Sequence, residues 1–181
     1  MGWKLKKSVV MVGMMGAGKS AVGKATAQLL DVPFRDSDAE IEAAANMTIA
    51  EIFARDGEDF FRKKERQVIA RLLEETPSIL STGGGAYMSE ENRRLISDHG
   101  AALWLDADLD LLWNRVRHRD TRPLLRTADP RATLRDLYDR RVPIYRMAEI
   151  AVQSLPGLSV HEMAGRVVEA LSEHQDLLEA A

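Results

Sequence analysis

The chain alternates between short apolar runs and longer stretches in which apolar residues recur at helical spacing. The short runs predict strands, which we expect over residues 8–12, 32–35, 78–81, 101–105 and 150–153. Apolar residues three or four apart predict helices over residues 19–30, 39–45, from about 49 to 56, 58–75, 90–98, 109–117, from 131 onward and from 160 onward. Strands that alternate with helices indicate an α/β fold with an open parallel sheet, whose ligands bind beyond the carboxyl ends of the strands.

Residues that favour helix ends occur near these boundaries. Those placed to cap or open a helix are Asp38, Thr48 with Glu51, Ser89, Pro130 and Ser159. Gly57 separates two helical stretches, and the polar, arginine-rich residues 118–129, interrupted by Pro123, predict a mobile loop. We expect the acidic residues 173–181 at the end of the chain to fray.

Length, composition and charge indicate one globular domain and exclude several classes of protein. The 181 residues, 45% hydrophobic and 29% charged, suffice to bury a core, so we expect a single domain over residues 1–181. A net charge of −3 gives no general attraction for nucleic acid or an anionic membrane. The chain has no cysteine, and its basic N-terminus lacks an apolar export segment. We therefore expect a cytoplasmic protein and, because no interface seam is evident, a monomer.

Residues 13–20 read Gly-Met-Met-Gly-Ala-Gly-Lys-Ser and lie between an expected strand and an expected helix. A triphosphate needs close backbone N–H groups, a helix N-terminus and a compact cation, and this segment offers all three. The residues expected to bind ATP are Gly16, Ala17, Gly18, Lys19, Ser20 and Ala21. A glycine turn that merely precedes a Lys-Ser pair is the alternative, and the flanking strand and helix disfavour it.

A nucleotide-bound Mg²⁺ needs oxygen ligands besides the Ser20 hydroxyl, and most proteins with this loop place a carboxylate at another strand end. The strand end at residues 80–83 has none. Asp36 and Asp38 follow the second expected strand and are the natural substitutes. Their alternative role is a simple turn and helix cap.

Six motifs in order along nearly the whole chain give it a resemblance to shikimate kinase. They are the loop at residues 13–20, Asp36-Ser37-Asp38, Asp56-Gly57-Glu58 followed by Phe61-Arg62, Gly83-Gly84-Gly85, Arg122-Pro123-Leu124-Leu125, and Arg141-Val142-Pro143-Ile144-Tyr145. The resemblance implies a P-loop kinase similar to the nucleoside monophosphate kinases, with a five-stranded parallel sheet flanked by helices. It also implies substrate-binding helices over about residues 36–65 and a mobile lid over about residues 115–129.

The same resemblance implies a reaction, in which ATP phosphorylates the 3-hydroxyl of shikimate to give shikimate 3-phosphate and ADP, a step toward chorismate and the aromatic amino acids. The implied catalytic residues are Lys19, Asp38 and Arg122. Asp38 would accept hydrogen bonds from substrate hydroxyls and act as a general base, and Asp36 would contact the water shell of Mg²⁺ beside Ser20.

The resemblance further implies how the two substrates are held. The substrate-binding residues would be Asp38, Arg62, Arg141 and, through its backbone N–H, Gly84. Planar guanidinium groups suit a carboxylate, and Glu65 could orient Arg62 through an i, i+3 pair. Arg122 would reach over the phosphates of ATP, and Pro156 would contact adenine. The residue at the base of the lid that stacks on adenine is an arginine in the family, and here Arg117, His118 and Arg119 compete for that position.

Two other functions share part of this pattern. A gluconate or nucleoside monophosphate kinase would have the phosphate loop but not both carboxylate-binding arginines. A nucleotide-binding interaction protein that phosphorylates nothing would not need Asp38, Arg62, Gly84 and Arg141 together.

The lid arginine yields the first prediction. We expect Arg122→Ala to lower turnover about tenfold or more while the fold stays intact, because its charge would stabilise the transferring phosphoryl group. Steady-state kinetics with a circular dichroism spectrum for each protein check this. Unchanged turnover would remove Arg122 from the mechanism.

Overall fold

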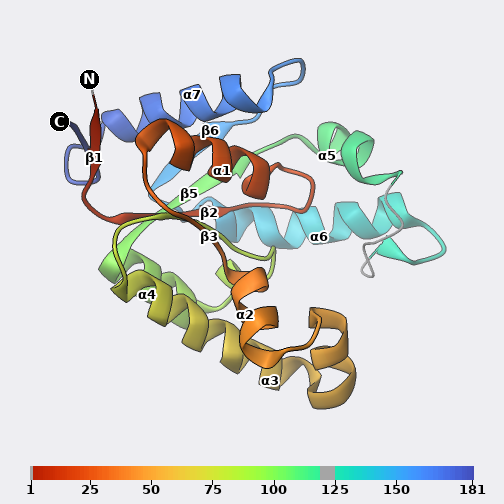
Figure 1. Cartoon of the computed structure of the whole chain (residues 1–181). Coiled ribbons are helices and arrows are strands. Elements are labelled where there is room, and N and C mark those ends of the chain that lie inside the picture. Colours follow the sequence, from red (N-terminus) through yellow and green to blue (C-terminus); the bar gives the residue numbers. More distant parts are fainter. Residues whose placement is uncertain (1, 119–124) are drawn as a thin grey trace.

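The structure is a computed structural model that describes residues 2–118 and 125–181. Its centre is a five-stranded sheet in the order β3-β4-β2-β5-β6, in which every pairing is parallel (Figure 1). The strands are β2 (Ser8–Val12), β3 (Phe34–Asp36), β4 (Ile79–Ser81), β5 (Gly100–Asp106) and β6 (Ile150–Gln153). The parallel α/β sheet predicted from the sequence is confirmed.

Helices cover both faces of this sheet. They are α1 (Lys19–Leu30), α2 (Ser37–Ala45), α3 (Ile49–Glu74), η1 (Ala86–Met88), α4 (Glu90–His99), α5 (Leu109–Val116), α6 (Pro130–Tyr145) and α7 (Val160–Ser172). In Figure 1, α1 and α7 lie side by side on one face, while α3 and α4 lie on the other. No helix in residues 2–118 or 125–181 is long and apolar enough to cross a membrane.

Coverage on both faces explains the continuous apolar run of the central strand. All five residues of β2 are buried, and Val9, Val10 and Met11 have no exposed surface. A strand of an antiparallel sheet with one wet face would instead alternate apolar and polar residues. Because β2 lies between β4 and β5, its carboxyl end leads the phosphate loop to the middle of the sheet edge, where ligands of open α/β sheets bind.

The start of α2 differs from the sequence prediction. Asp36, not Asp38, is the N-cap: its Oδ1 accepts hydrogen bonds from the N–H groups of Asp38 at 2.9 Å and Ala39 at 3.3 Å. The helix therefore begins at Ser37, and Asp38 lies inside the first turn. In a cluster with two aspartates, the one that ends the strand has the extended backbone that a cap requires, here φ −113° and ψ 119°.

The long helix α3 contains one break, at Gly57. There φ is 86° and ψ is 172°, which is a non-helical conformation inside an otherwise continuous helix. Positive φ favours glycine because that residue lacks a Cβ. The break separates the two helical stretches as the sequence indicated, and it turns the first stretch back toward α2, as Figure 1 shows.

The expected fraying of residues 173–181 is wrong. Residues Leu178–Ala180 form β7, which pairs antiparallel with β1 (Trp3–Leu5) and joins the two ends of the chain. Leu178 is fully buried, Leu177 is 3% exposed, and Lys6 lies 2.8 Å from Glu179. Two leucines hidden among acidic residues thus stabilise a pairing that local sequence does not predict.

This pairing yields a stability prediction. Leu178→Ala removes a fully buried side chain and should lower the melting temperature by roughly 5–15 °C, as expected for a core leucine. Leu29→Ala is the matched control, because Leu29 is 39% exposed on α1. Thermal unfolding followed by calorimetry measures both. Equal melting temperatures for the two variants would show that the C-terminal strand adds nothing to stability.

Candidate active site

A cavity of about 1540 Å³ opens at the carboxyl edge of the sheet. The phosphate loop, the first turn of α2, the segment after β4, and parts of α3, α5 and α6 line it. Most residues expected from the sequence meet around this one space: Gly16, Ala17, Gly18, Lys19, Ser20, Ala21, Asp36, Asp38, Arg62, Gly84 and Arg141. The sheet topology thus gathers segments from across the whole chain at one site.

The phosphate loop forms one end of the cavity. Gly16 and Gly18 have positive φ angles of 84° and 95°, so the loop curls in a way that only glycine adopts easily. Gly18 precedes α1 without a side-chain cap, and the first N–H groups of that helix therefore point to the cavity mouth unblocked by a carboxylate or hydroxyl. Lys19 donates to the carbonyl oxygens of Gly13 at 2.6 Å and Met14 at 3.1 Å. The loop is arranged to receive an anion.

Three oxygen-bearing side chains meet beside the loop. The Ser20 hydroxyl donates to Asp36 Oδ2 at 3.3 Å and lies 3.2 Å from the Ser81 hydroxyl. Ser81 is buried at the end of β4, where the sequence reasoning looked only for a carboxylate and passed over it. Oxygen donors of this kind suit Mg²⁺. Within the described part of the chain no group of three or more His, Cys, Asp or Glu side chains is placed to hold a metal ion.

Asp38 lines the cavity, and one oxygen of its carboxylate has no hydrogen-bond partner among the described residues. Its Oδ1 is buried and accepts no hydrogen bond. Burial raises the pKa of this carboxyl above the ordinary aspartate value, the nearby Asp36 carboxylate adds to the rise, and the Lys19 ammonium partly offsets it. An unpaired carboxylate of raised proton affinity is suited to accept a proton from a bound hydroxyl.

Arg62 and Glu65 form an ion pair one turn apart on α3. Arg62 Nη1 donates to Glu65 Oε1 at 2.8 Å, as the i, i+3 spacing indicated, and Glu58 lies 3.7 Å from Arg62 Nε. Glu65 is only 1% exposed, and burial raises its pKa although Arg62 lowers it in part. Its second oxygen, Oε2, is buried without a partner. Glu65 therefore orients Arg62 and also offers a free acceptor to the cavity, a role that sequence reasoning missed.

Tyr145 holds α6 against the glycine segment after β4. Its hydroxyl donates to the carbonyl oxygen of Gly84 at 2.6 Å, and burial raises its pKa to about 12. Trp104 on β5 lies near this ring, with centroids 6.3 Å apart. Arg141, one turn before Tyr145, reaches the cavity from the same helix. The hydrogen bond of Tyr145 thus fixes the position of α6, and with it that of Arg141, relative to the glycine segment.

The expected adenine contacts are placed differently from the sequence hypotheses. Arg117 and His118 do not line the cavity, and Pro156 lies in an exposed turn between β6 and α7 outside the lining. Arg119 and Arg122 lie outside the described residues. Arg115 was missed: its Nη1 donates to the carbonyl oxygens of Gly16 at 3.0 Å and Ala17 at 3.3 Å.

Arg115 therefore stands against the phosphate loop, and burial lowers its pKa. The available signal was its place on α5, one turn after Leu112 and next to Val116, both of which are buried. A charged residue on the buried side of a short amphipathic helix points toward a site.

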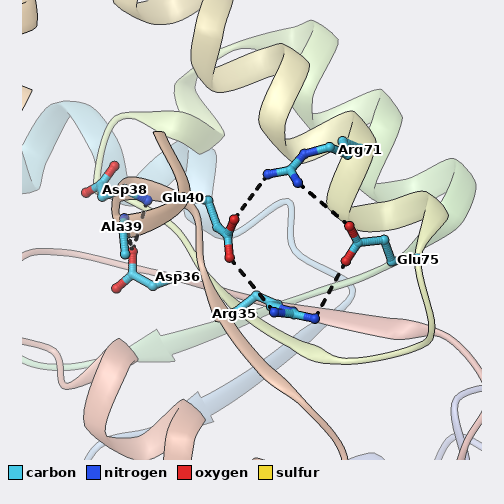
Figure 2. Close-up of polar contacts among 7 residues, drawn as sticks. All are labelled: Arg35, Asp36, Asp38, Ala39, Glu40, Arg71 and Glu75. Carbon is cyan, nitrogen blue, oxygen red and sulfur yellow. Dashed lines mark hydrogen bonds and ion pairs between the residues drawn. The ribbon is translucent and has the colours of Figure 1, made fainter. Parts of the chain in front are cut away.

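Four alternating charges tie α2 and β3 to α3 beside the two aspartates (Figure 2). Arg71 Nη2 lies 3.1 Å from Glu40 Oε2 and its Nη1 lies 3.9 Å from Glu75 Oε1. Arg35 lies 4.0 Å from Glu40 and 3.9 Å from Glu75. Exposed pairs of this type each contribute only about 0.2–1 kcal/mol. Their effect is to link the segment that carries the aspartates, at both of its ends, to the helix that carries Arg62.

The unpaired carboxylate yields a stability prediction. Asp38→Asn should raise the melting temperature by a few °C at pH 7.5, because it removes a buried charge that has no partner at one oxygen. A raised pKa in the folded state destabilises the fold above that pKa, and the penalty disappears as pH falls toward the ordinary aspartate value of about 3.9. The advantage of the variant should therefore shrink at pH 5.

Asp36→Asn is the matched control in the same thermal scans. Asparagine caps a helix as well as aspartate does, so this variant keeps an acceptor for the N–H groups of Asp38 and Ala39 and should change the melting temperature little. A melting temperature for Asp38→Asn no higher than that of Asp36→Asn would contradict the assignment of Asp38 Oδ1 as a buried oxygen without a partner.

Comparisons with known proteins identify the family. A model of the shikimate kinase family matches residues 15–172. The shikimate kinase of Ruegeria pomeroyi is 66% identical over 97% of this chain and 90% of that relative, and that of Cereibacter sphaeroides is 64% identical over 97% and 88%. A structure of shikimate kinase from Acinetobacter baumannii in complex with shikimate covers 93% of this chain and 94% of its own, with TM-score 0.87 and 34% identity.

A gluconokinase structure from Sinorhizobium meliloti covers 94% of both chains with TM-score 0.61, but at 18% identity it shows a common fold alone. The family match includes residues 15–20 of the phosphate loop and the helices that carry Arg62 and Arg141. The chain belongs to the shikimate kinase family.

Proposed function

We propose that this shikimate kinase transfers the γ-phosphoryl group of ATP to the 3-hydroxyl of shikimate across the cavity at the carboxyl edge of the sheet, giving shikimate 3-phosphate and ADP. One observation carries the proposal: a phosphate loop at one end of the cavity faces two arginines and two buried carboxylates at the other. A donor with several phosphates and an acceptor with one carboxylate and several hydroxyls match these two ends in charge and in hydrogen-bonding groups.

The donor end would hold the β- and γ-phosphates of ATP. The N–H groups of Gly16 and Gly18 and those that open α1 would bind phosphate oxygens, and Lys19 would exchange the carbonyl oxygens of Gly13 and Met14 for phosphate oxygens. Ser20 and, through water, Asp36 would hold Mg²⁺ with those phosphates. The ion would supply charge neutralisation for the transferring group.

The acceptor end would hold shikimate by its carboxylate and its hydroxyls. Arg62 and Arg141 present guanidinium groups from two different helices, which allows paired hydrogen bonds to one carboxylate. Glu65 Oε2 and Asp38 Oδ1, both buried and unpartnered, would accept hydrogen bonds from substrate hydroxyls. Asp38 would take the proton of the attacking hydroxyl, which leaves that oxygen free to bond to phosphorus.

The transfer itself needs mainly positioning and charge stabilisation. Asp38 and Lys19 both line the cavity, and the Lys19 ammonium partly offsets the rise in the pKa of Asp38. We propose that Arg122, in a lid over about residues 115–129, adds a cation over the phosphates and that closing the lid excludes water.

For adenine we propose Arg115 in place of the three candidates from the sequence. Its hydrogen bonds to the carbonyls of the phosphate loop hold the guanidinium near the donor end, where its planar face would stack on adenine. Pro156 follows Ser154, which does line the cavity, and adenine contact at Pro156 stays a prediction.

The remaining expectations belong to this proposal. Residues 36–65 would form the acceptor-binding region of a single domain, and the protein would be a cytoplasmic monomer that uses Mg²⁺ with ATP. A gluconate kinase or a nucleotide-binding switch would not require the buried pair of Arg62 with Glu65 beside Arg141, which disfavours both alternatives.

The assay measures ADP release by the purified protein with ATP, with and without shikimate and Mg²⁺. We expect ADP formation only when both are present. Arg141→Ala should raise KM for shikimate about 10–100-fold and leave KM for ATP nearly unchanged, whereas Arg115→Ala should raise KM for ATP about 3–10-fold and spare that for shikimate.

Gluconate and AMP replace shikimate in parallel reactions as controls for acceptor specificity. ADP release with either of them and not with shikimate would overturn the proposal. If the two arginine variants raised both KM values equally, the assignment of donor and acceptor ends would be wrong.

A further inference from the structure

The segment Gly83-Gly84-Gly85 follows β4 and lines the cavity, and its backbone does not require glycine. Within the described residues the glycines with positive φ are Gly13, Gly16, Gly18, Gly57 and Gly157. None of the three consecutive glycines is among them, and Gly85 has an ordinary helical conformation with φ −89° and ψ −10°. Alanine would fit the backbone at all three positions, so another constraint must account for the missing side chains.

That constraint is the space each Cβ would occupy. A Cβ on Gly85 would lie 2.5 Å from Nη2 and 3.0 Å from Nη1 of Arg62. A Cβ on Gly84 would lie 2.7 Å from Nη1 of Arg141. A Cβ on Gly83 would lie 3.1 Å and 3.2 Å from the two carboxylate oxygens of Asp38. Each glycine therefore makes room for a different side chain of the acceptor site.

Close approach occurs at other glycines too, but not to charged groups of the cavity: a Cβ on Gly16 would lie 2.7 Å from Val116 Cγ1, and one on Gly100 would meet the Ser8 carbonyl oxygen. At Gly57, Gly157 and Gly165 no heavy atom lies within 4 Å of the position that a Cβ would take. The three atoms approached most closely at residues 83–85 come from α2, α3 and α6, which have no sequence relation to one another. Three side chains from different helices thus contact one run of consecutive residues, 83–85, which serves as a common contact surface.

Hydrogen bonds hold the backbone of residues 82–85 in place, so it cannot move to accommodate an added methyl group. The Gly84 carbonyl accepts the Tyr145 hydroxyl at 2.6 Å, and Thr82 donates its hydroxyl to the Met11 carbonyl of the central strand at 3.1 Å. The Gly83 and Gly85 carbonyls accept the N–H groups of Ala86 and Met88 at 3.1 Å and 3.2 Å. The flexible ends of the arginines would move instead.

We infer that the triple glycine is a template that positions the acceptor-binding side chains. Gly83 leaves room for Asp38, Gly84 for Arg141 and Gly85 for Arg62. The inference rests on the proposed function, because it assigns these side chains to shikimate. Gly83 and Gly85 are positioning residues that act through their partners. Alanine at position 84 would keep the backbone N–H expected to bind substrate, so that substitution also acts through the partner side chain. Displacement of a guanidinium by the width of a methyl contact is enough to spoil a two-point hold on a carboxylate.

Alanine substitutions separate the three positions. Gly85→Ala and Gly84→Ala should each raise KM for shikimate about tenfold with kcat changed less than about threefold, because they displace carboxylate-binding groups. Gly83→Ala should instead lower kcat about three- to tenfold, since its partner is the proposed base and the contact is less severe. Gly165→Ala, at an exposed position on α7, is the matched control and should leave both constants unchanged.

A double-mutant cycle tests whether each glycine acts through its own partner. In an Arg62→Ala background, Gly85→Ala should have almost no further effect on KM for shikimate, because the displaced group is already gone. In an Arg141→Ala background, the same Gly85→Ala change should keep its full effect. The reciprocal pattern is expected for Gly84→Ala, and circular dichroism with melting curves shows that each variant is folded.

The outcomes separate this inference from the proposed function. A wild-type protein without shikimate-dependent ADP release would overturn the proposed function before any variant is made. With an active wild type, two results would overturn the template. One is that Gly85→Ala raises KM for shikimate by the same factor in the Arg62→Ala background as in the wild type. The other is that all three glycine variants leave KM and kcat unchanged.

Discussion

The Asp36 carboxylate is the interaction on which the rest of the site depends, because it connects the donor and acceptor ends. One oxygen caps α2 and thereby orients the turn that carries Asp38. The other accepts the hydroxyl of Ser20 at the start of α1, directly after the phosphate loop. One side chain at the end of β3 thus sets the place of the metal-side serine and of the proposed base relative to each other.

Around that link the protein keeps buried charge that its own side chains do not fully satisfy. Asp38 Oδ1 and Glu65 Oε2 have no hydrogen-bond donor, and burial raises the pKa of both carboxyls. Such groups destabilise a fold unless a ligand supplies the missing partner. A substrate with several hydroxyls would supply donors to both. The same two oxygens would then contribute to substrate binding and, once paired, would no longer destabilise the fold.

The sequence predicted the parallel sheet and the phosphate loop well, because a continuous apolar strand, a glycine loop and an amphipathic helix are local patterns. It assigned the helix cap to Asp38 instead of Asp36, since two aspartates two residues apart fit one cap equally well until the strand end is known. It missed β7 and Arg115, whose roles depend on contacts with residues far away in the chain. The sequence also could not predict why residues 83–85 are all glycine, because only the folded chain shows which side chains approach them.

The central claim is that one cavity holds a carboxylate between two arginines and a hydroxyl at Asp38, facing the phosphate loop. A crystal structure with ADP, Mg²⁺ and shikimate tests it most directly. We expect the shikimate carboxylate to accept hydrogen bonds from Arg62 and Arg141, and the 3-hydroxyl to lie within hydrogen-bond distance of Asp38 and on the side of the β-phosphate. A carboxylate bound away from these arginines, or a 3-hydroxyl turned away from the nucleotide, would contradict the account.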